Sequence, residues 1–156
     1  MCGIIGVTGE ADALPVILGA LHQLEYRGYD SAGVALVVDG EIWRARAADG
    51  THSVADLAGL TQDAPTGHAA AIGHTRWATH GHPTLENAHP HLDCTGRLAL
   101  IHNGIIENHA SLRADLLADG HIMTSATDTE VMAHLIERHL AQGLTLTEAT
   151  EPRCTR

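Results

Sequence analysis

Apolar and polar residues follow one another along the chain in patterns that predict several strands and helices. The stretch CGIIGVT (residues 2–8) is short, apolar and β-branched, which is typical of a buried strand. From residue 12 to residue 26, leucine and isoleucine recur at three- and four-residue steps, which predicts an amphipathic helix. AGVALVV and EIWRARA flank Asp39-Gly40, a pair that favours the tight turn of a β-hairpin. We expect a short helix near residues 53–60.

The second half of the chain predicts further strands and two longer helices. AAAIGHTRW is expected to be a buried strand, and RLALIHNG a further strand that stops at Asn103-Gly104, with an irregular segment from 78 to 96 between them. Residues 107–118 and 128–142 have helical periodicity, and Thr127 with Glu130 forms a candidate capping box for the second helix. Because strands come in hairpin-like pairs with helices between the groups, we expect an α+β fold rather than a doubly wound parallel sheet.

Composition and charge exclude several classes of protein. The 156 residues suffice for one domain with a buried core, and 44% apolar with 18% charged residues is a globular composition. The formal net charge is −10 and the nine basic residues include no lysine, so we expect no nucleic-acid partner and no membrane binding. No apolar run reaches the length of a membrane span, and no signal peptide is recognisable. An odd number of cysteines, three, then favours a reduced, cytoplasmic location.

Histidine is unusually frequent, which raises the question of a metal site. The thirteen histidines gather in HTRWATHGHP, NAHPHLD and IHNGIIENH, and include the pairs His80/His82 and His89/His91. No HExxH or CxxC pattern accompanies them, and the pairs lie in sequence typical of loops. We therefore expect neither a metal ion nor any other cofactor.

Cys2 directly follows the initiator methionine and is a candidate nucleophile. If Met1 is removed, Cys2 carries both a thiol and a free α-amine, whose reference pKa of roughly 7.7–8.0 allows it to act as a base near neutral pH. A thiol beside a base is an activated nucleophile. The ordinary alternative is a small buried residue in a first strand.

Other polar residues stand at the ends of predicted elements, where scaffolds often carry functional groups. Arg76 and Trp77 close one strand, Asn103-Gly104 closes another, and Asp128 begins a helix. Each position also has an ordinary explanation, namely a surface ion pair, a turn and a helix cap.

Six motifs, taken in order, resemble those of one family: MCGIIG, LEYRGYDSAG, GHTRWATHG, NAHPH, HNGIIEN and TDTEV. They resemble the class II glutamine amidotransferase domain, specifically the amino-terminal glutaminase domain of glutamine–fructose-6-phosphate aminotransferases (isomerizing). The resemblance covers residues 1–149, and residues 150–156 form a tail outside it. It implies a four-layer αββα sandwich with antiparallel sheets, the N-terminal-nucleophile (Ntn) hydrolase fold, incomplete at its carboxyl end.

The resemblance also implies a mechanism. Met1 is removed and Cys2 attacks the side-chain amide of glutamine, while its α-amine carries the thiol proton to the departing ammonia. Asn103, through its side-chain amide, and Gly104, through its backbone N–H, match the oxyanion hole, where one donor contributes roughly 2.7–4 kcal/mol in the transition state. A histidine or aspartate partner for the thiol is then unnecessary.

Glutamine recognition follows from the same resemblance. Arg76 matches the ligand of the α-carboxylate, since a planar guanidinium binds a carboxylate through two hydrogen bonds, and Asp128 matches the ligand of the α-ammonium. His82, His91 and His102 are interpreted as structural or surface residues. The other residues that the resemblance places in or near the pocket are Trp77, Thr79 and His80 in a closing loop, and Arg27, Gly28 and His89 close to the nucleophile.

The leading hypothesis is therefore a glutaminase that supplies ammonia for glucosamine 6-phosphate synthesis. Fructose 6-phosphate would bind only to an isomerase domain absent from this chain, and full-length relatives are expected to be homo-oligomers. Two alternatives stay open. One is another class II amidotransferase, such as an amidophosphoribosyltransferase, although GHTRWATHG differs from the GHxRYST of that branch. The other is a catalytically incompetent fragment or glutamine-binding module.

The carboxyl end departs from the family pattern. After LTLTEA the chain reads TEPRCTR, and Pro152 cannot continue a helix interior. A frameshift, a short gene or an incomplete gene model would each produce this departure. We expect the chain alone to have at best weak glutaminase activity.

Overall fold

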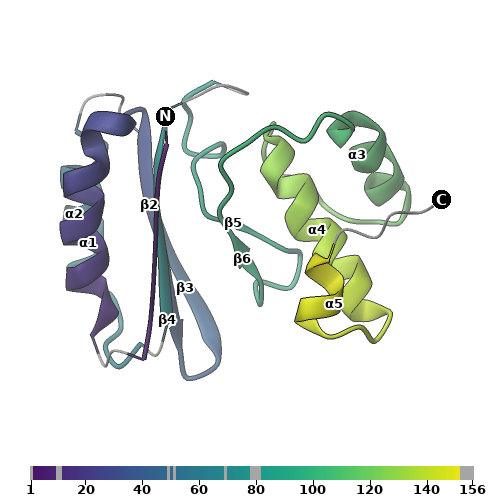
Figure 1. Ribbon diagram of the computed structural model, residues 1–156, viewed down its shortest axis with the longest axis horizontal. Coiled ribbons are helices and arrows are strands. Elements are labelled where there is room, and N and C mark those ends of the chain that lie inside the picture. The colour runs from purple at the N-terminus through teal and green to yellow at the C-terminus, as the bar shows by residue number, and fades with distance from the viewer. Residues whose placement is uncertain are drawn as a thin grey trace.

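Helices and sheets pack in four layers (Figure 1). The computed structural model describes residues 2–9, 12–48, 50, 52–68, 70–77 and 82–151. The first layer holds two helices, the second a four-stranded sheet, the third a two-stranded sheet, and the fourth three helices. Both sheets are antiparallel. This order confirms the expected α+β sandwich.

The four-stranded sheet brings the start of the chain against the end of a distant strand. Its strands are β1 (Gly3–Thr8), β2 (Ser31–Val38), β3 (Glu41–Ala47) and β4 (Ala70–Arg76), in the order β1-β4-β2-β3. Gly3 pairs with Thr75, and Ser31 pairs with Arg76. The end of β4 therefore lies between the starts of β1 and β2, and Cys2 comes to the same edge as Arg76.

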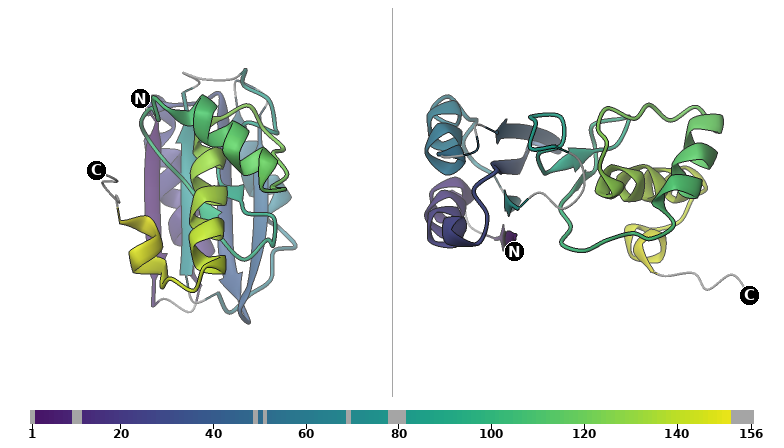
Figure 2. Two further views of the ribbon diagram at one scale, coloured as in Figure 1. Left: turned by 90° about the vertical axis from the view of Figure 1, so that its right-hand side faces the viewer. Right: turned by 90° about the horizontal axis from the view of Figure 1, so that it is seen from above.

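Two helices cover one face of this sheet and make the main core. They are α1 (Ala13–Leu24), followed by a 3₁₀ turn (Glu25–Arg27), and α2 (Ser53–Leu60). Figure 2, seen from above, shows them side by side on the sheet. Ile17 and Leu21 of α1 and Leu57 of α2 are fully buried with Leu36 of β2. Burying each such side chain contributes roughly 1.5–3 kcal/mol, which fixes the helices on the sheet.

The second pair of layers lies on the opposite face. The small sheet consists of β5 (His91–Leu92) and β6 (Ala99–Leu100), and the outer helices are α3 (His109–Ala118), α4 (Asp128–Ala141) and α5 (Leu146–Thr150). The segment before β5 lies against β2 at Gly33, where an added Cβ would overlap the carbonyl oxygen of His89. Glycine at this position allows the segment before β5 to lie directly on β2.

Most predicted elements are confirmed. The hairpin turns at Asp39 and Gly40, which both adopt positive φ, and α2 has the predicted bounds. α1, α3 and α4 agree with the predicted helices to within two residues at each end. None of the helices in the described part of the chain combines the length and apolar character needed to cross a lipid bilayer.

Four predictions differ from the structure. β1 is covered on one face only, since Ile4 is 44% exposed. The segment 78–96, expected to be irregular, contains the short strand β5. RLALIHNG forms only the two-residue β6, and the Asp93 carboxylate ends the ladder on its amino-terminal side by accepting hydrogen bonds from the Arg97 and Leu98 N–H groups.

The predicted capping box at Thr127 is half formed. The Thr127 hydroxyl accepts from Glu130 N–H, but the Glu130 carboxylate accepts from Thr124 and Ser125 instead of Thr127. The complete box is at α5, between Thr145 and Glu148, and was not predicted.

Candidate active site

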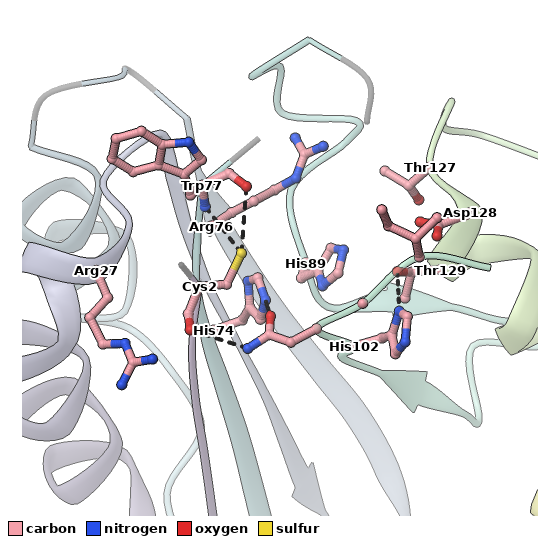
Figure 3. A pocket seen from close by; sticks show the side chains of 13 residues that line it. Cys2, Arg27, His74, Arg76, Trp77, His89, His102, Thr127, Asp128 and Thr129 are labelled. Carbon is pink, nitrogen blue, oxygen red and sulfur yellow. Dashed lines mark hydrogen bonds between the residues drawn. The ribbon is translucent and has the colours of Figure 1, made fainter. Parts of the chain in front are cut away.

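A pocket of about 510 Å³ opens at the end of β4, between the four-stranded sheet and the start of α4 (Figure 3). This volume is in the range of small-molecule sites. The side chains around it come from segments far apart in sequence. They are Cys2, Arg27, His74, Arg76, Trp77, His89, His102, Asn103, Gly104, Ile105, Thr127, Asp128 and Thr129.

The sulfur of Cys2 is held by the backbone at the end of β4. Trp77 N–H donates to Cys2 Sγ at 3.2 Å, and Sγ lies 3.5 Å from the Trp77 carbonyl oxygen. Gly28 packs directly behind this position, since an added Cβ would lie 2.7 Å from the carbonyl carbon of Arg76. The backbone therefore sets where the sulfur points.

The Asn103 amide is fixed by two hydrogen bonds. Its Nδ2 donates to the Cys2 carbonyl oxygen at 3.2 Å, and its Oδ1 lies 2.9 Å from His74 Nε2. If the amide were rotated by 180°, Asn103 Oδ1 would face the Cys2 carbonyl oxygen, and both atoms are hydrogen-bond acceptors. His74 Nε2 therefore carries the proton and donates to Oδ1. One N–H of Nδ2 remains for a ligand beside the sulfur.

Gly104 follows Asn103 with φ of +157°, and an added Cβ would lie 2.8 Å from His102 Nε2. Only glycine fits this backbone beside the His102 ring. The chain thus keeps the peptide at Asn103-Gly104 close to the pocket without a side chain over it.

Arg76 and Asp128 place opposite charges on facing walls of the pocket (Figure 3). Both are buried, at 4% and 6% exposure. Burial lowers the pKa of Arg76, and the charges of Cys2, Asp30 and Asp128 act in the opposite direction, but a guanidinium stays protonated. Asp128 Oδ2 accepts from Ile106 N–H at 2.8 Å, which fixes the carboxylate at the first turn of α4. The two walls suit a molecule that carries both an anion and a cation.

Three buried histidines contact one another at the pocket, and two of them, His74 and His89, line it. The rings of His74 and His89 are tilted with centroids 4.3 Å apart, and His91 meets His89 edge-on at 4.8 Å. Burial lowers the pKa of His74 to about 4, against the effect of its hydrogen bond to Asn103, and burial lowers the pKa of His91 to about 3. Burial also lowers the pKa of His89. At neutral pH the three rings are therefore uncharged.

The structure brings most of the predicted site residues together. Eight line one pocket, and Gly28 supports its wall through the Arg76 backbone. Figure 3 shows Arg27 on the α1 side of Cys2, away from Asp128. Thr79 and His80 lie outside the described residues. The eight are Cys2, Arg27, Arg76, Trp77, His89, Asn103, Gly104 and Asp128.

Sequence reasoning missed five lining residues, namely His74, His102, Ile105, Thr127 and Thr129. His102 was interpreted as structural or surface, but it lines the pocket and its Nδ1 lies 3.4 Å from Thr129 Oγ1. All five lie inside the motifs GHTRWATHG, HNGIIEN and TDTEV, one or two positions from a predicted site residue. Treating every polar residue of these motifs next to or two positions from a predicted site residue as a candidate would have found four of them.

The groups that line this pocket suit acyl transfer. A thiol, an amide N–H beside it and two opposite charges are the groups needed to hold an amino acid and attack a carbonyl group on it.

Comparison with known proteins agrees with this assignment. The family model described as a glutamine amidotransferase domain matches residues 40–148. A glutamine–fructose-6-phosphate aminotransferase (isomerizing) of Symbiobacterium thermophilum is 54% identical over 136 residues, 87% of this chain and 22% of that protein. The one of Streptomyces coelicolor is 51% identical over 157 residues, 100% of this chain and 25% of that protein. The chain thus spans about a quarter of the length of these curated relatives.

Solved structures share the fold. A glutamine phosphoribosylpyrophosphate amidotransferase of B. subtilis, complexed with ADP and GMP, is similar with a TM-score of 0.75 and 29% identity over 96% of this chain and 31% of that chain. A structure described as the allosteric regulatory enzyme of purine biosynthesis gives a TM-score of 0.77 at the same identity and coverage. These similarities confirm the predicted N-terminal-nucleophile fold.

Proposed function

The chain belongs to the glutamine amidotransferase family, and on this premise we propose that it hydrolyses the side-chain amide of glutamine through a thioester on Cys2. One observation carries the proposal. The Cys2 sulfur, the Asn103 amide and the charge pair of Arg76 and Asp128 surround a single pocket, although they come from four distant segments.

The nucleophile is the Cys2 thiolate. After removal of Met1, the free α-amine of Cys2 takes the thiol proton, and Trp77 N–H supports the charge on sulfur. Attack on the amide carbon of glutamine forms the carbon–sulfur bond and moves an electron pair onto the amide oxygen. Collapse of this intermediate breaks the carbon–nitrogen bond, and the α-amine returns the proton so that ammonia leaves. Water then cleaves the thioester to glutamate and restores the thiol.

The oxyanion formed in this step needs donors beside the sulfur. Asn103 Nδ2 has one N–H bound to the Cys2 carbonyl and a second for the oxyanion, and the Gly104 N–H is the other proposed donor. Because His74 and Cys2 already hold the amide, little reorganisation is needed when charge develops.

The α-groups of glutamine match the charged walls. We assign its α-carboxylate to Arg76 and its α-ammonium to Asp128, which keeps the side chain extended toward Cys2. Trp77, Thr79, His80, His89, Arg27 and Gly28 complete the proposed site. A substrate with only one of the two charges would lose one of these two contacts, so we expect a preference for a free amino acid.

In the whole protein we propose that the ammonia serves glucosamine 6-phosphate synthesis from fructose 6-phosphate. The support is identity of 49–54% to aminotransferases of that name, against 29% to the phosphoribosylpyrophosphate amidotransferase of B. subtilis. The acceptor sugar would bind to a different region of the protein. A reduced, cytoplasmic location and homo-oligomeric full-length relatives fit this role.

The test uses the purified chain with Met1 removed. Glutamate and ammonia should form from glutamine, and a glutamine analogue that carries an electrophile should label the Cys2 peptide, as mapped by mass spectrometry. Cys2→Ser should abolish both results, and a variant that retains Met1 should not react. His22→Gln, on the exposed face of α1, is the matched control and should behave like the parent. Labelling at Cys94 or Cys154 instead of Cys2 would overturn the proposal.

A further inference from the structure

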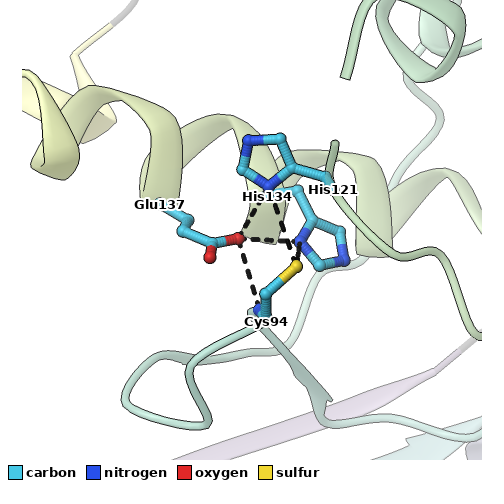
Figure 4. A group of neighbouring side chains, drawn as sticks. All are labelled: Cys94, His121, His134 and Glu137. Atoms are coloured by element: carbon cyan, nitrogen blue, oxygen red, sulfur yellow. Dashed lines mark hydrogen bonds and ion pairs between the residues drawn. The ribbon is translucent and has the colours of Figure 1, made fainter. Parts of the chain in front are cut away.

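Four potential metal ligands converge in the outer half of the molecule (Figure 4). Cys94 lies in the turn that follows β5, His121 lies in the segment between α3 and α4, and His134 and Glu137 lie one turn apart on α4. None of the four lines the pocket that contains Cys2. The cluster therefore has no part in the proposed glutamine chemistry.

The distances between the ligand atoms suit one small cation. Cys94 Sγ lies 3.5 Å from His134 Nδ1 and 3.8 Å from His121 Nδ1. Glu137 Oε2 lies 2.9 Å from each of the two Nδ1 atoms. All four atoms lie within 4.8 Å of one another. Tetrahedral zinc with bonds of 2.0–2.3 Å requires ligand atoms about 3.3–3.6 Å apart, so small shifts would complete the geometry.

The donor set also selects the metal. One thiolate, two imidazoles and one carboxylate are the ligands that zinc takes in proteins, whereas magnesium and calcium prefer oxygen ligands alone. With the thiol deprotonated, two anionic and two neutral ligands balance the charge of a divalent ion. Three of the four ligands are sheltered, since the His134 side chain is 2% exposed and the His121 and Glu137 side chains are 12% and 13% exposed, whereas Cys94 is exposed and gives solvent a path to the site.

A second group of contacts holds these ligands in place. His134 Nε2, the ring nitrogen that faces away from the cluster, makes no hydrogen bond within the described residues, and the carboxylate of Glu130 lies 4.0 Å from it. Metal-binding histidines in proteins commonly donate this second N–H to a carboxylate, so a small shift would complete that contact. Ile122 N–H donates to Cys94 Sγ at 3.3 Å, and Cys94 N–H donates to Glu137 Oε2 at 3.2 Å. The cluster is thus pre-formed from three segments.

We propose that Cys94, His121, His134 and Glu137 bind one zinc ion, which joins the β5–β6 turn to α4 and to the α3–α4 connection. Four protein ligands leave no open position, so the site is structural. This inference revises our expectation from the sequence that the histidines bind no metal. That expectation considered the clusters of neighbouring histidines, and none of these four residues belongs to a HExxH or CxxC pattern.

Metal binding must displace protons from the cluster. The ionised Glu137 carboxylate can only accept, so each imidazole carries its proton on Nδ1 before the metal binds. Zinc takes the place of the Nδ1 proton on both rings, and on each ring that proton moves through solvent to Nε2, which on His134 faces Glu130. The Cys94 thiol proton is released to solvent. The metal–sulfur, metal–nitrogen and metal–oxygen bonds form without any redox step.

Cobalt(II) is the probe, because its bond to a thiolate absorbs in the near ultraviolet. The full chain, stripped with a chelator, should gain this absorption up to one cobalt per chain, and zinc should displace it. Cys94→Ser should abolish the band. His134→Gln and Glu137→Gln should each weaken zinc affinity by at least about 100-fold, since even residues that only orient ligands change it by roughly 10- to 100-fold. Cys2→Ser and His109→Gln are matched controls and should bind like the parent.

A measurement on the unaltered chain guards against variants that fail to fold. Zinc should protect Cys94 from alkylation, as mapped by mass spectrometry, whereas millimolar magnesium should not. Zinc should also raise the temperature of half-unfolding of the unaltered chain. A chain that gives no thiolate–cobalt band, or whose Cys94 alkylates equally fast with and without zinc, would overturn the proposal. A band that persists in Cys94→Ser would do the same.

Discussion

His74 Nε2 lies 2.9 Å from Asn103 Oδ1, and this contact joins the four-stranded sheet to the segment that carries the proposed oxyanion donor. His74 is buried, and burial lowers its pKa to about 4, so the ring is neutral over the whole physiological range. It acts on the reaction through Asn103 and not on the substrate, which makes it a positioning residue.

Removing the His74 imidazole should therefore lower the rate of the chemical step more than substrate binding. We expect His74→Ala to reduce kcat for glutamine hydrolysis roughly 10-fold or more, since loss of one oxyanion donor costs about 10²–10³ in rate. KM should change less than kcat. His74→Gln, which keeps a donor, should recover part of the rate. Steady-state kinetics measure both values, and an increase in KM alone would show that His74 has no role in placing Asn103.

Both the hydrogen-bond geometry of Arg76 and the charge of Asp128 should be needed for glutamine binding. Arg76→Lys keeps the charge but cannot form two parallel hydrogen bonds with a carboxylate, so we expect glutamine affinity to fall roughly 10- to 100-fold. Asp128→Asn keeps an acceptor for Ile106 N–H and removes the counter-charge for the ammonium, with a similar loss. Titration calorimetry on the Cys2→Ser background separates binding from turnover. A variant that binds glutamine like the parent would return its residue to a structural role.

A methyl group at position 28 should disturb the nucleophile without touching it. In Gly28→Ala the new Cβ would meet the Arg76 carbonyl group and the Trp77 nitrogen at 2.7–2.9 Å. We expect a loss of about 1–3 kcal/mol of stability, as for other overpacked sites, and lower kcat/KM because the N–H that holds Cys2 Sγ moves.

Gly19→Ala is the matched control for this prediction. Position 19 lies in α1, with nothing within 4 Å of an added Cβ, so alanine should stabilise the helix by up to about 1 kcal/mol. Denaturant unfolding and glutaminase kinetics measure both variants. Equal activity of Gly28→Ala and the parent would refute the link between Gly28 and the sulfur.

Stability should fall as the pH decreases from about 6.5 toward 5. The folded pKa values of His74, His89 and His91 are lowered by burial, to about 4 for His74 and about 3 for His91, while unfolded histidine titrates near 6.5. The unfolded chain then binds more protons than the folded chain. The stabilisation that these three neutral rings give the folded chain is complete above pH 6.5. Below pH 6.5 the free energy of unfolding falls by up to about 1.4 kcal/mol per pH unit for each ring.

Chemical denaturation at about pH 7, 6 and 5 measures this dependence. In this window the Glu130 and Glu137 carboxylates, whose folded pKa values are lowered from 4.5, contribute little, and His134, whose pKa Glu130 and Glu137 raise against the effect of burial, acts in the opposite direction as a single ring against three. His91→Gln keeps a hydrogen-bond partner for Thr127 and should reduce the slope of the unfolding free energy against pH by about one proton. His22→Gln, on the surface, should leave this slope unchanged. An identical slope in His91→Gln and the parent would contradict the argument.

Local features of the fold were predictable from the sequence, and features made by distant side chains were not. The turn at Asp39-Gly40 needs only two residues that accept positive φ, so the hairpin was found. The length of β6 depends on the Asp93 side chain, which captures two backbone N–H groups, and no periodicity shows this.

The two candidate sites differ in the same way. Each residue of the glutamine pocket sits in a short motif, so the resemblance identified residues that lie up to 126 positions apart, such as Cys2 and Asp128. Cys94, His121 and His134 stand alone in their segments, and only the fold brings them together. His74 was missed because its role depends on the orientation of the Asn103 amide, which requires coordinates.

The start of α4 is anchored unusually firmly. The Glu130 carboxylate accepts hydrogen bonds from the backbone N–H and the hydroxyl groups of both Thr124 and Ser125. Asp128 lies one half-turn before Glu130 on the same helix. Since each residue of a helix adds 1.5 Å along the axis, Glu137 lies about 13 Å from Asp128 along α4. If α4 tilted by about 5° around Glu137, Asp128 would move by about 1 Å. An error of this size in the placement of a reacting group costs roughly 100-fold in rate. α4 therefore acts as a lever arm, and the contacts that fix its orientation determine how accurately Asp128 is placed for the α-ammonium of the substrate.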